Sequence, residues 1–322
     1  MHRLLVTGGC GFIGSNFIRL MLGKYPDLKI INLDRLTYAG NPDNLKDVED
    51  CPNYGFVKGD ICDAAVVRAA MKKADTVVHF AAESHVDRSI GDGSVFVRTN
   101  VLGTNTLLQA ARELGIRKFL HVSTDEVYGS TMNGSFVETD NLRPSSPYSA
   151  SKAGSDLLAL SYHTTYGLPV VVTRCTNNYG PYQYPEKLIP LFVTNLIQGL
   201  KVPVYGNGMN VRDWIYVLDH CKAIDFVLRN GADGEVYNIG GGAERTNMEI
   251  TRAIMKLLGK GEHMIEYVRD RPGHDLRYSL DCSKLKAMGW RPEHDFGDAL
   301  AMTVRWYVDN AWWWEKLKRS RP

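Results

Sequence analysis

Short apolar runs alternate with amphipathic stretches through the first half of the chain. Six apolar runs have the length and composition of buried strands: Leu4–Thr7, Lys29–Leu33, Tyr54–Val57, Thr76–Phe80, Phe119–Val122 and Val170–Thr173. Between them lie stretches with helical periodicity, among them Ile13–Leu22, Ala64–Met71, Val97–Leu114 and Ala150–Tyr166. This alternation predicts an α/β fold in which helices cover both faces of a doubly wound parallel sheet.

The regular alternation ends at about residue 180. The turn-rich segment Pro181–Pro185 comes first, and Lys187–Gly199 then has a helical pattern. Further strands are expected at Arg212–Tyr216 and Gly234–Ile239, and a helix at Thr246–Leu258, where Thr246 and Glu249 have the spacing of a capping box. We expect a smaller, irregular α/β lobe that is interleaved with returns to the main sheet.

Composition excludes several classes of protein. The chain has 322 residues, of which 44% are apolar and 23% charged, and its net charge of +2 creates no strong field for nucleic acid or membranes. Six cysteines lack metal-ligand spacing and indicate reduced thiols: Cys10, Cys51, Cys62, Cys175, Cys221 and Cys282. Because no apolar run approaches the ~20 residues of a membrane span and the first strand leaves no room for a signal peptide, we expect a cytoplasmic protein without a metal.

A glycine motif follows the first predicted strand. Gly8, Gly11 and Gly14 allow a tight turn, so that a pyrophosphate can approach the N-terminus of the next helix. The second strand ends at Asp34, twenty residues after Gly14, where a carboxylate can accept hydrogen bonds from ribose hydroxyls. Together these features predict a Rossmann-type domain that binds NAD, although Arg35 next to Asp34 is a mild signal for NADP.

Other polar or small residues follow the third and fourth strands. Asp60 and Ile61 could contact the adenine, but Asp60 could equally cap a helix. Ala81 and Ala82 let the backbone pass close to a cofactor, whereas His85 by itself has the more ordinary interpretation of a structural histidine.

Tyr148 and Lys152 are four residues apart and share one face of a predicted helix. A tyrosine with a pKa of about 10 is a poor base near neutrality, but a nearby ammonium and a positive nicotinamide ring would favour its phenolate. Tyr148 would then take a hydroxyl proton while the carbon gives its hydride to NAD, and Thr124 is placed to bind the same hydroxyl.

Asp125 and Glu126 directly follow Thr124 in the sequence. These two carboxyl groups indicate a second chemical step besides the oxidation. Once C4 of a sugar is a ketone, Glu126 could remove the acidified C5 proton and Asp125 could protonate the departing C6 hydroxyl. Asp125 must then stay protonated near neutrality, which burial and a carboxylate neighbour would favour. Because neighbouring strand residues point to opposite faces, both carboxyls reach one substrate only if the strand ends by about Ser123.

With these residues assembled, the chain resembles the extended short-chain dehydrogenase/reductase family and, within it, the dTDP-glucose 4,6-dehydratases. The motifs are Thr7–Gly14, Leu36–Asn41, Ala81–Arg88, Ser123–Gly129, Tyr148–Lys152, Asn177–Pro181 and Asp270–His274, so that the resemblance covers essentially the full length. The glycine motif and the tyrosine–lysine pair are shared with sugar-nucleotide epimerases and decarboxylases. The specific marks are Asp125 beside Glu126 and the stretch Glu83–Ser89.

The resemblance implies a tightly held NAD and a dTDP-sugar substrate. It places at the cofactor the residues Phe12, Ile13, Asp34, Arg35, Leu36, Thr37, Asp60, Ile61, Thr99, Tyr148, Lys152 and Asn178. It places at the sugar nucleotide the residues Ser84, Thr124, Asn177, Lys187, Leu188, Tyr205, Arg212, Asn247, Arg271 and His274. On this basis, residues 1–180, with returns around 211–240, are expected to form the NAD-binding domain, and residues 181–322 mainly the sugar-nucleotide lobe.

The implied activity is that of a lyase. It would dehydrate dTDP-glucose to dTDP-4-keto-6-deoxyglucose, a step that leads to deoxysugars such as rhamnose or antibiotic sugars. A 4-epimerase or decarboxylase would not need Asp125 and Glu126, and an NAD-sensing regulator would not need Tyr148 and Lys152; the choice between thymidine and uridine diphosphate stays open.

The resemblance further implies a homodimer that pairs the helices around Val97–Leu114 and Ala150–Tyr166. Ala153, Leu157, Leu158 and Leu160 fit such an interface, but packing within one subunit would give a similar pattern. Trp306–Tyr307 and Trp312–Trp314 are expected to anchor a terminal helix in the core.

Overall fold

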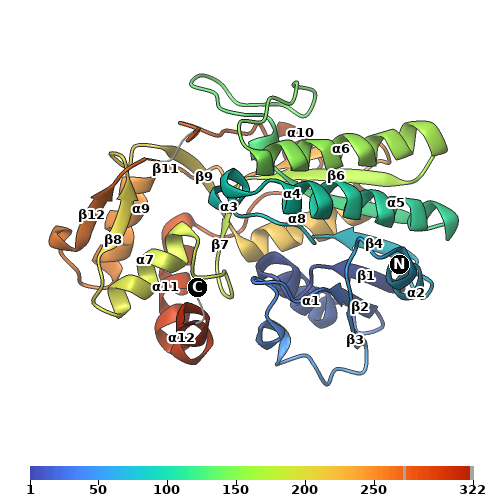
Figure 1. Ribbon diagram of the computed structural model, residues 1–322, viewed down its shortest axis with the longest axis horizontal. Helices are drawn as coiled ribbons and strands as arrows, with labels where there is room; N and C mark the ends of the chain where they lie inside the picture. Colours follow the sequence, from blue (N-terminus) through green and yellow to red (C-terminus); the bar gives the residue numbers. More distant parts are fainter. Residues whose placement is uncertain (271–272, 320–322) are drawn as a thin grey trace.

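The computed structural model describes residues 1–270 and 273–319 (Figure 1). Its centre is a seven-stranded, entirely parallel sheet with the order β10-β6-β5-β4-β1-β2-β3. The strands are β1 (Arg3–Thr7), β2 (Lys29–Asp34), β3 (Tyr54–Lys58), β4 (Thr76–His79), β5 (Lys118–Thr124), β6 (Val170–Cys175) and β10 (Val236–Ile239). The predicted doubly wound sheet is confirmed, and the strand expected near Gly234–Ile239 joins its edge.

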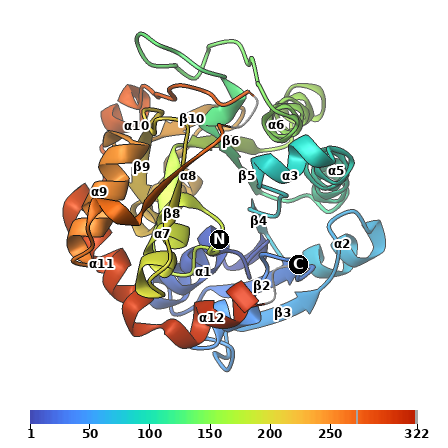
Figure 2. The same ribbon diagram turned by 60° about the vertical axis from the view of Figure 1, so that its left-hand side comes forward.

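Helices cover both faces of this sheet (Figures 1 and 2). One group consists of α1 (Phe12–Lys24) and α8 (Val217–Asn230), and the other of α2 (Ala64–Met71), α5 (Thr104–Glu113) and α6 (Pro147–Tyr166). Successive residues of a strand point to opposite faces. Leu4 and Val6 accordingly belong to one hydrophobic core and Leu5 to the other.

The remaining elements form a smaller group beside the sheet, on the left of Figure 1. Strands β11 (Glu244–Thr246), β9 (Val211–Tyr216) and β7 (Asn177–Tyr179) form one sheet, while β12 (Ile265–Val268) and β8 (Val202–Tyr205) form another. The helices of this group are α7 (Leu188–Ile197), α9 (Asn247–Leu257), α11 (Phe296–Asp309) and α12 (Ala311–Arg319), whereas the short α10 (Ser283–Ala287) lies near β10 of the main sheet. The predicted capping box is present at the start of α9, whereas the proposed domain boundary near residue 180 stays a prediction.

The region predicted as one helix at Val97–Leu114 is more complex. The short α3 (Val86–Gly91) and α4 (Ser94–Phe96) precede a π-helical segment, Val97–Gly103, which continues into α5. The wider turns contain Asn100, whose buried side chain bonds both backbone groups of Glu83 and the Ser151 hydroxyl. Such local widening accompanies functional positions in many helices, and here it fixes a segment that lines the cleft.

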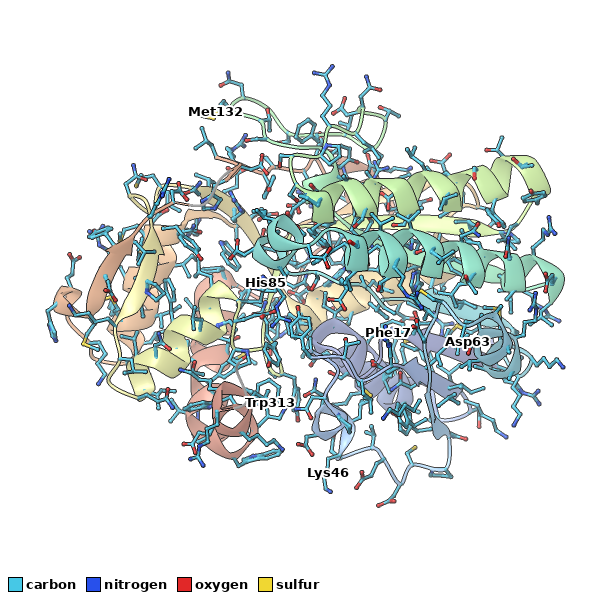
Figure 3. All side chains as sticks on the ribbon, viewed as in Figure 1. Phe17, Lys46, Asp63, His85, Met132 and Trp313 are labelled. Carbon is cyan, nitrogen blue, oxygen red and sulfur yellow. The ribbon has the colours of Figure 1, made fainter. Side chains whose placement is uncertain are left out.

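The predicted anchoring of the aromatic C-terminus is confirmed for Trp306, Tyr307, Trp313 and Trp314, which pack in or against the core, but not for Trp312, which is exposed. Trp313 and Trp314 are buried, and Trp313 in α12 lies against the region around Asn44 (Figure 3). Within residues 1–270 and 273–319, none of the helices combines the length and apolarity needed to cross a membrane.

Candidate active site

The polar clusters that follow β1 to β6 converge on one cleft, as expected for the carboxyl edge of a doubly wound sheet. Most of the predicted site residues line it: Gly8, Gly11, Phe12, Ile13, Gly14, Asp34, Arg35, Thr37, Asp60, Ile61, Ala81, Ala82, Ser84, Thr99, Thr124, Asp125, Glu126, Tyr148, Lys152, Asn177, Asn178 and Lys187. The structure thereby brings the glycine motif, the carboxyl pair and the tyrosine–lysine pair into one cavity.

A second set of predicted residues does not line the cleft: Leu36, Leu188, Tyr205, Arg212, Asn247 and His274. Arg212 is buried and donates to the carbonyl oxygens of Val211 and Asp275, while its guanidinium lies over the Tyr278 ring. Tyr205 is exposed at the end of β8, with its ring 6.1 Å from that of His274. Arg271 lies outside the described residues.

The glycine loop closes tightly around the start of α1. Gly8 has a φ of 71°, and a Cβ atom there would lie 2.6 Å from the Ala81 nitrogen. A Cβ on Gly14 would lie 2.4 Å from the Gly8 carbonyl oxygen. Gly11 is the N-cap of α1 and provides no side-chain hydrogen bond, so the first N–H groups of the helix are left for an anionic ligand.

Asp34 joins the glycine loop to the segment after β2. Its carboxylate accepts hydrogen bonds from the backbone N–H of Cys10 at 2.9 Å and of Leu36 at 2.8 Å. Leu36 has a φ of 58°, a strained left-handed conformation for this residue, and Asp34 holds it there. Burial raises the pKa of Asp34, and the two backbone N–H groups oppose that shift.

Asp60 lies at the cleft but does not cap α2, so the alternative interpretation as a helix cap is wrong. Asp63 is the cap and accepts from the backbone N–H of Ala65 and Val66. Asp60 forms an ion pair with Arg35 at 3.2 Å, and a carboxylate that opposes the Arg35 charge makes that arginine a poorer site for a 2′-phosphate.

His85 has the structural role that the sequence favoured. Its Nδ1 accepts a hydrogen bond from the Arg88 backbone N–H at the start of α3, and its Nε2 lies 3.7 Å from Glu186 (Figure 3). Because burial lowers the pKa of His85, the ring is a weak base.

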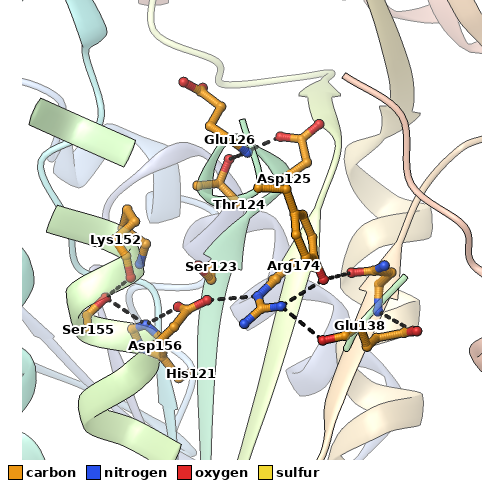
Figure 4. A network of polar contacts seen from close by, with 12 residues as sticks. His121, Ser123, Thr124, Asp125, Glu126, Glu138, Lys152, Ser155, Asp156 and Arg174 are labelled. Carbon is orange, nitrogen blue, oxygen red and sulfur yellow. Dashed lines mark hydrogen bonds and ion pairs between the residues drawn. The ribbon is translucent and has the colours of Figure 1, made fainter. Parts of the chain in front are cut away.

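The two adjacent carboxyls lie in a turn, which resolves the geometric difficulty of a strand. Strand β5 ends at Thr124, one residue later than required, and Asp125–Val127 forms a single 3₁₀ turn (Figure 4). The Thr124 hydroxyl caps this turn by accepting from the Glu126 N–H and donates to Asp125 Oδ1 at 3.2 Å. Both carboxyl groups can therefore face the same cavity.

Asp125 is almost completely buried, with 3% of its surface exposed. Burial and the negative charge of Glu126 raise its pKa well above the usual value, in the direction the sequence predicted, while Arg212 opposes the shift. Its Oδ2 has no hydrogen-bond partner among the described residues, so an acid is held here with one oxygen available to a ligand.

Tyr148 and Lys152 lie on the first turns of α6, which a capping box at Ser146 and Ser149 starts. The Lys152 ammonium donates to the Val122 carbonyl oxygen at 2.8 Å, and burial lowers its pKa to about 8. Burial and Glu126 raise the pKa of Tyr148 well above its usual value, while the Thr124 hydroxyl lowers it. In the protein without a cofactor, burial and Glu126 therefore oppose ionisation of Tyr148. A bound nicotinamide ring and the Lys152 ammonium are expected to favour it.

Several residues that line the cleft were not predicted as site residues, among them Tyr38, Gly40, Glu83, Cys175, Gln183 and Glu186. Tyr38 and Gly40 belong to the motif Leu36–Asn41, and Glu186 directly precedes the predicted site residue Lys187. The sequence therefore contained information that could have identified these three residues. Cys175 is the last residue of β6, next to the carboxyl pair. The sequence predicted only that Cys175 is a reduced thiol.

The fold and the cleft define a nicotinamide-dependent enzyme of the extended short-chain dehydrogenase/reductase type. Residues 5–303 match the model of the GDP-mannose 4,6 dehydratase family, and the chain belongs to this family. It is 56% identical over 321 residues to a dTDP-glucose 4,6-dehydratase of Streptomyces niveus, which covers 98% of this chain and 96% of the relative.

Solved structures show the same relationship. DesIV, a dTDP-glucose 4,6-dehydratase from Streptomyces venezuelae that was crystallised with NAD and TYD bound, is 57% identical over 98% of this chain and 99% of its own, with a TM-score of 0.96. A UDP-glucose 4-epimerase of Thermus thermophilus in complex with NAD is 32% identical over 96% of this chain and 99% of its own, with a TM-score of 0.89.

Proposed function

We propose that this protein is an NAD-dependent lyase that dehydrates dTDP-glucose to dTDP-4-keto-6-deoxyglucose. The observation that carries the proposal is the buried Asp125 beside Glu126 in the cleft that also contains Tyr148 and Lys152. Oxidation of an alcohol alone has no use for an acid of raised pKa next to a second carboxylate. Relatives named as dTDP-glucose 4,6-dehydratases cover nearly the whole chain and support the same substrate.

The residues at the glycine loop fit NAD. Close approach of the backbone at Gly8 and Gly14 leaves the uncapped N-terminus of α1 facing the cleft, where it can bind the pyrophosphate. The remaining lone pairs of the Asp34 carboxylate can accept from the adenosine ribose. Bound NAD would accept a hydride from C4 of the sugar and return it to C6 in the same turnover.

Tyr148 is the base in the oxidation step of this mechanism. Its phenolate removes the proton from the C4 hydroxyl, and Thr124 hydrogen-bonds the same oxygen. Lys152, one turn further along α6 and fixed to Val122, supplies positive charge for this step. Because burial and Glu126 oppose ionisation of the phenol, Tyr148 becomes an effective base only when a cation is bound next to it.

Asp125 and Glu126 divide the work of the elimination. Glu126 takes the C5 proton, which the C4 ketone has made acidic, and Asp125 gives its proton to the C6 hydroxyl as water leaves. Glu126 then returns its proton to C5 when hydride is added to C6. The Asp125 Oδ2, which has no hydrogen-bond partner within residues 1–270 and 273–319, is the atom assigned to the C6 hydroxyl. General acid and base groups of this kind contribute about 10²–10⁴-fold each to the rate.

The test is incubation of the purified protein with dTDP-glucose, without added NAD, and analysis of the product mass. Loss of one water without net redox change supports the dehydratase, and a parallel reaction with UDP-glucose determines the nucleotide preference. Asp125→Asn and Glu126→Gln should each reduce water loss by about 10²–10⁴-fold. An isomer of unchanged mass, formed equally by both variants, would instead identify a 4-epimerase.

We also propose that the protein acts as a homodimer in the cytoplasm. Val97, Leu102 and Leu157 expose about half of their surface on neighbouring helical elements, with exposed fractions of 56%, 49% and 59%. An apolar hollow borders this patch and is lined by Val97, Val101, Leu102 and Leu158 among others. Light scattering would test the assembly, and Leu157→Glu should shift a dimer toward monomers.

A further inference from the structure

Tyr128 closes the turn that carries the two carboxyls. Its backbone N–H donates to the Asp125 carbonyl oxygen at 3.0 Å, and its side chain is 1% exposed. The phenol ring stacks on Phe136, with centroids 5.1 Å apart and an angle of 8° between the planes. Tyr128 does not line the cleft, so any influence on the reaction acts through the turn.

The Tyr128 hydroxyl is held by a buried hydrogen-bond network that includes Arg174, which is labelled in Figure 4. It accepts from Arg174 Nη1 at 2.7 Å and donates to Asn238 Oδ1 at 2.9 Å. Arg174 comes from β6 and is 3% exposed, and its Nε donates to Asp156 Oδ2 in α6 at 2.9 Å. The arginine therefore links the carboxyl turn to the helix that carries Tyr148 and Lys152.

Charge in this network is balanced. Asp156 is fully buried, and the Arg174 charge and the nearby His121 ring lower its pKa, although burial opposes them. Because burial lowers the pKa of His121 to about 4, that ring is neutral near pH 7 and Arg174 is the counter-ion. The Arg174 Nε–Asp156 Oδ2 bond and the Arg174 Nη1–Tyr128 bond restrict the geometry of the arginine, although Asp156 Oδ1 has no hydrogen-bond partner among the described residues.

The two parts of the site depend on this network to different degrees. Lys152 is tied directly to β5 through Val122, so the tyrosine–lysine pair keeps its place against the sheet without Arg174. The Asp125–Val127 turn projects beyond the end of β5, and the Tyr128 side chain anchors its far end. Loss of that anchor should displace the carboxyls more than the base for the oxidation.

We propose that Tyr128 is a positioning residue for the elimination step, held by Arg174 and Asn238. This inference rests on the proposed function. The hydroxyl fixes the turn so that Asp125 and Glu126 stay aligned with a substrate that Tyr148 has oxidised. A displacement of about 1 Å at reacting groups can reduce a rate by about 10²-fold, so a hydrogen bond outside the cleft can control this step.

Tyr128→Phe tests the proposal because it keeps the stacked ring and removes only the hydroxyl. With dTDP-glucose, we expect kcat for water loss to fall about tenfold or more, while KM and the NAD content change less than about twofold. Since hydride removal outpaces elimination in the variant, reduced nicotinamide, with absorbance near ~340 nm, should build up during turnover above the level in the wild type. Asn238→Ala, which removes the acceptor of the tyrosine hydroxyl, should give the same signature.

Tyr237→Phe is the matched control. Tyr237 lies on β10, is 3% exposed, and its hydroxyl accepts from the Ala232 N–H at 2.9 Å, so the substitution also deletes a buried hydrogen bond. It should lower thermal stability to a similar extent without any build-up of reduced nicotinamide. If Tyr128→Phe keeps the wild-type kcat, or slows turnover with no extra reduced nicotinamide, the positioning role is wrong. If the wild type itself releases no water from dTDP-glucose, the proposed function fails instead.

Discussion

The two halves of the cleft are built in different ways. The half predicted to bind the cofactor consists of loops that directly follow β1 to β4, and backbone atoms packed at glycines shape it. The half predicted to bind the sugar nucleotide depends on side chains from β8, β9 and α9, several of which lie outside the cleft lining. Arg212 shows the contrast, since its guanidinium bonds carbonyl oxygens of the protein itself.

This difference separates a preformed site from one that must rearrange. Backbone contacts at Gly8 and Gly14 cannot change without moving α1, so the cofactor half is rigid before NAD binds. The predicted role of Arg212 at the sugar nucleotide would require it to exchange the Asp275 carbonyl for an anionic ligand, and charge-assisted bonds to an anion are stronger than those to a carbonyl. We therefore expect substitutions in the first half to change NAD retention and those in the second half to change KM.

The largest effect is expected for Gly14→Ala. The new Cβ would lie 2.4 Å from the Gly8 carbonyl oxygen and 2.8 Å from the Gly9 Cα, both backbone atoms, so the loop must open. Overpacking of this kind costs about 1–3 kcal/mol, and the purified variant should contain less than about a tenth of the wild-type NAD. Absorbance of the released cofactor and thermal unfolding measure the two effects.

Gly23→Ala is the control in the same helix. A Cβ at Gly23 meets no atom within 4 Å, so this variant should gain up to about 1 kcal/mol of stability from helix propensity and retain its NAD. Equal NAD loss in both variants would contradict a rigid, preformed glycine loop.

Arg212→Lys should have the second largest effect, in the other half. A lysine cannot reproduce the planar pair of donors, so KM should rise about 10–100-fold, equivalent to about 1.5–3 kcal/mol, while NAD content stays at the wild-type level. Arg245→Lys is the control, because Arg245 is the ladder partner of Arg212 between β11 and β9 but is exposed. A loss of NAD from the Arg212→Lys variant would contradict the expectation that the two halves of the cleft bind their ligands independently.

The sequence predicted those parts of the molecule in which residues that are close in the sequence are also close in space. Gly8 to Gly14, Asp34 and the pair Tyr148–Lys152 each occupy one turn or strand end, so their spacing alone indicates their function. The sheet was predicted for the same reason, since apolar strands and amphipathic helices are local patterns.

Residues that meet only through the tertiary fold could not be predicted in this way. Arg174 pairs with Asp156 and Tyr128 across three elements, and no spacing between them indicates that contact. The effect of burial and Glu126, which raise the pKa of Tyr148 in the protein alone, could not be predicted from spacing, and the predicted phenolate next to a bound nicotinamide ring stays a prediction. The π-helical turns at Val97–Gly103 likewise depend on long-range bonds of Asn100.

Asp125→Asn should change the pH dependence of stability. The folded state raises the pKa of Asp125 above its unfolded value near ~3.9, so the proton binds more tightly to the folded protein. That contribution is fully present below the unfolded pKa and is lost as the pH rises through the folded pKa. Relative to the wild type, the asparagine variant should therefore gain stability as the pH rises from 4 toward and beyond neutrality, in urea unfolding of NAD-free protein. A constant difference between the two proteins would contradict a raised pKa.

Trp313→Phe should have the smallest effect, again on the cofactor half. The Trp313 Nε1 donates to Asn44 Oδ1 at 2.8 Å, and Asn44 Nδ2 donates to the carbonyl oxygen of Cys10 in the glycine loop at 2.8 Å. Removing the Trp313–Asn44 hydrogen bond should weaken NAD binding by about 1 kcal/mol. NAD should therefore dissociate about two- to fivefold faster, with kcat at saturating NAD unchanged. Trp312→Phe is the control, since Trp312 is 54% exposed and its Nε1 donates only to Asn310 among the described contacts. Equal dissociation rates for the wild type and Trp313→Phe would show that the rigidity of the glycine loop is local and needs no support from the C-terminal helix.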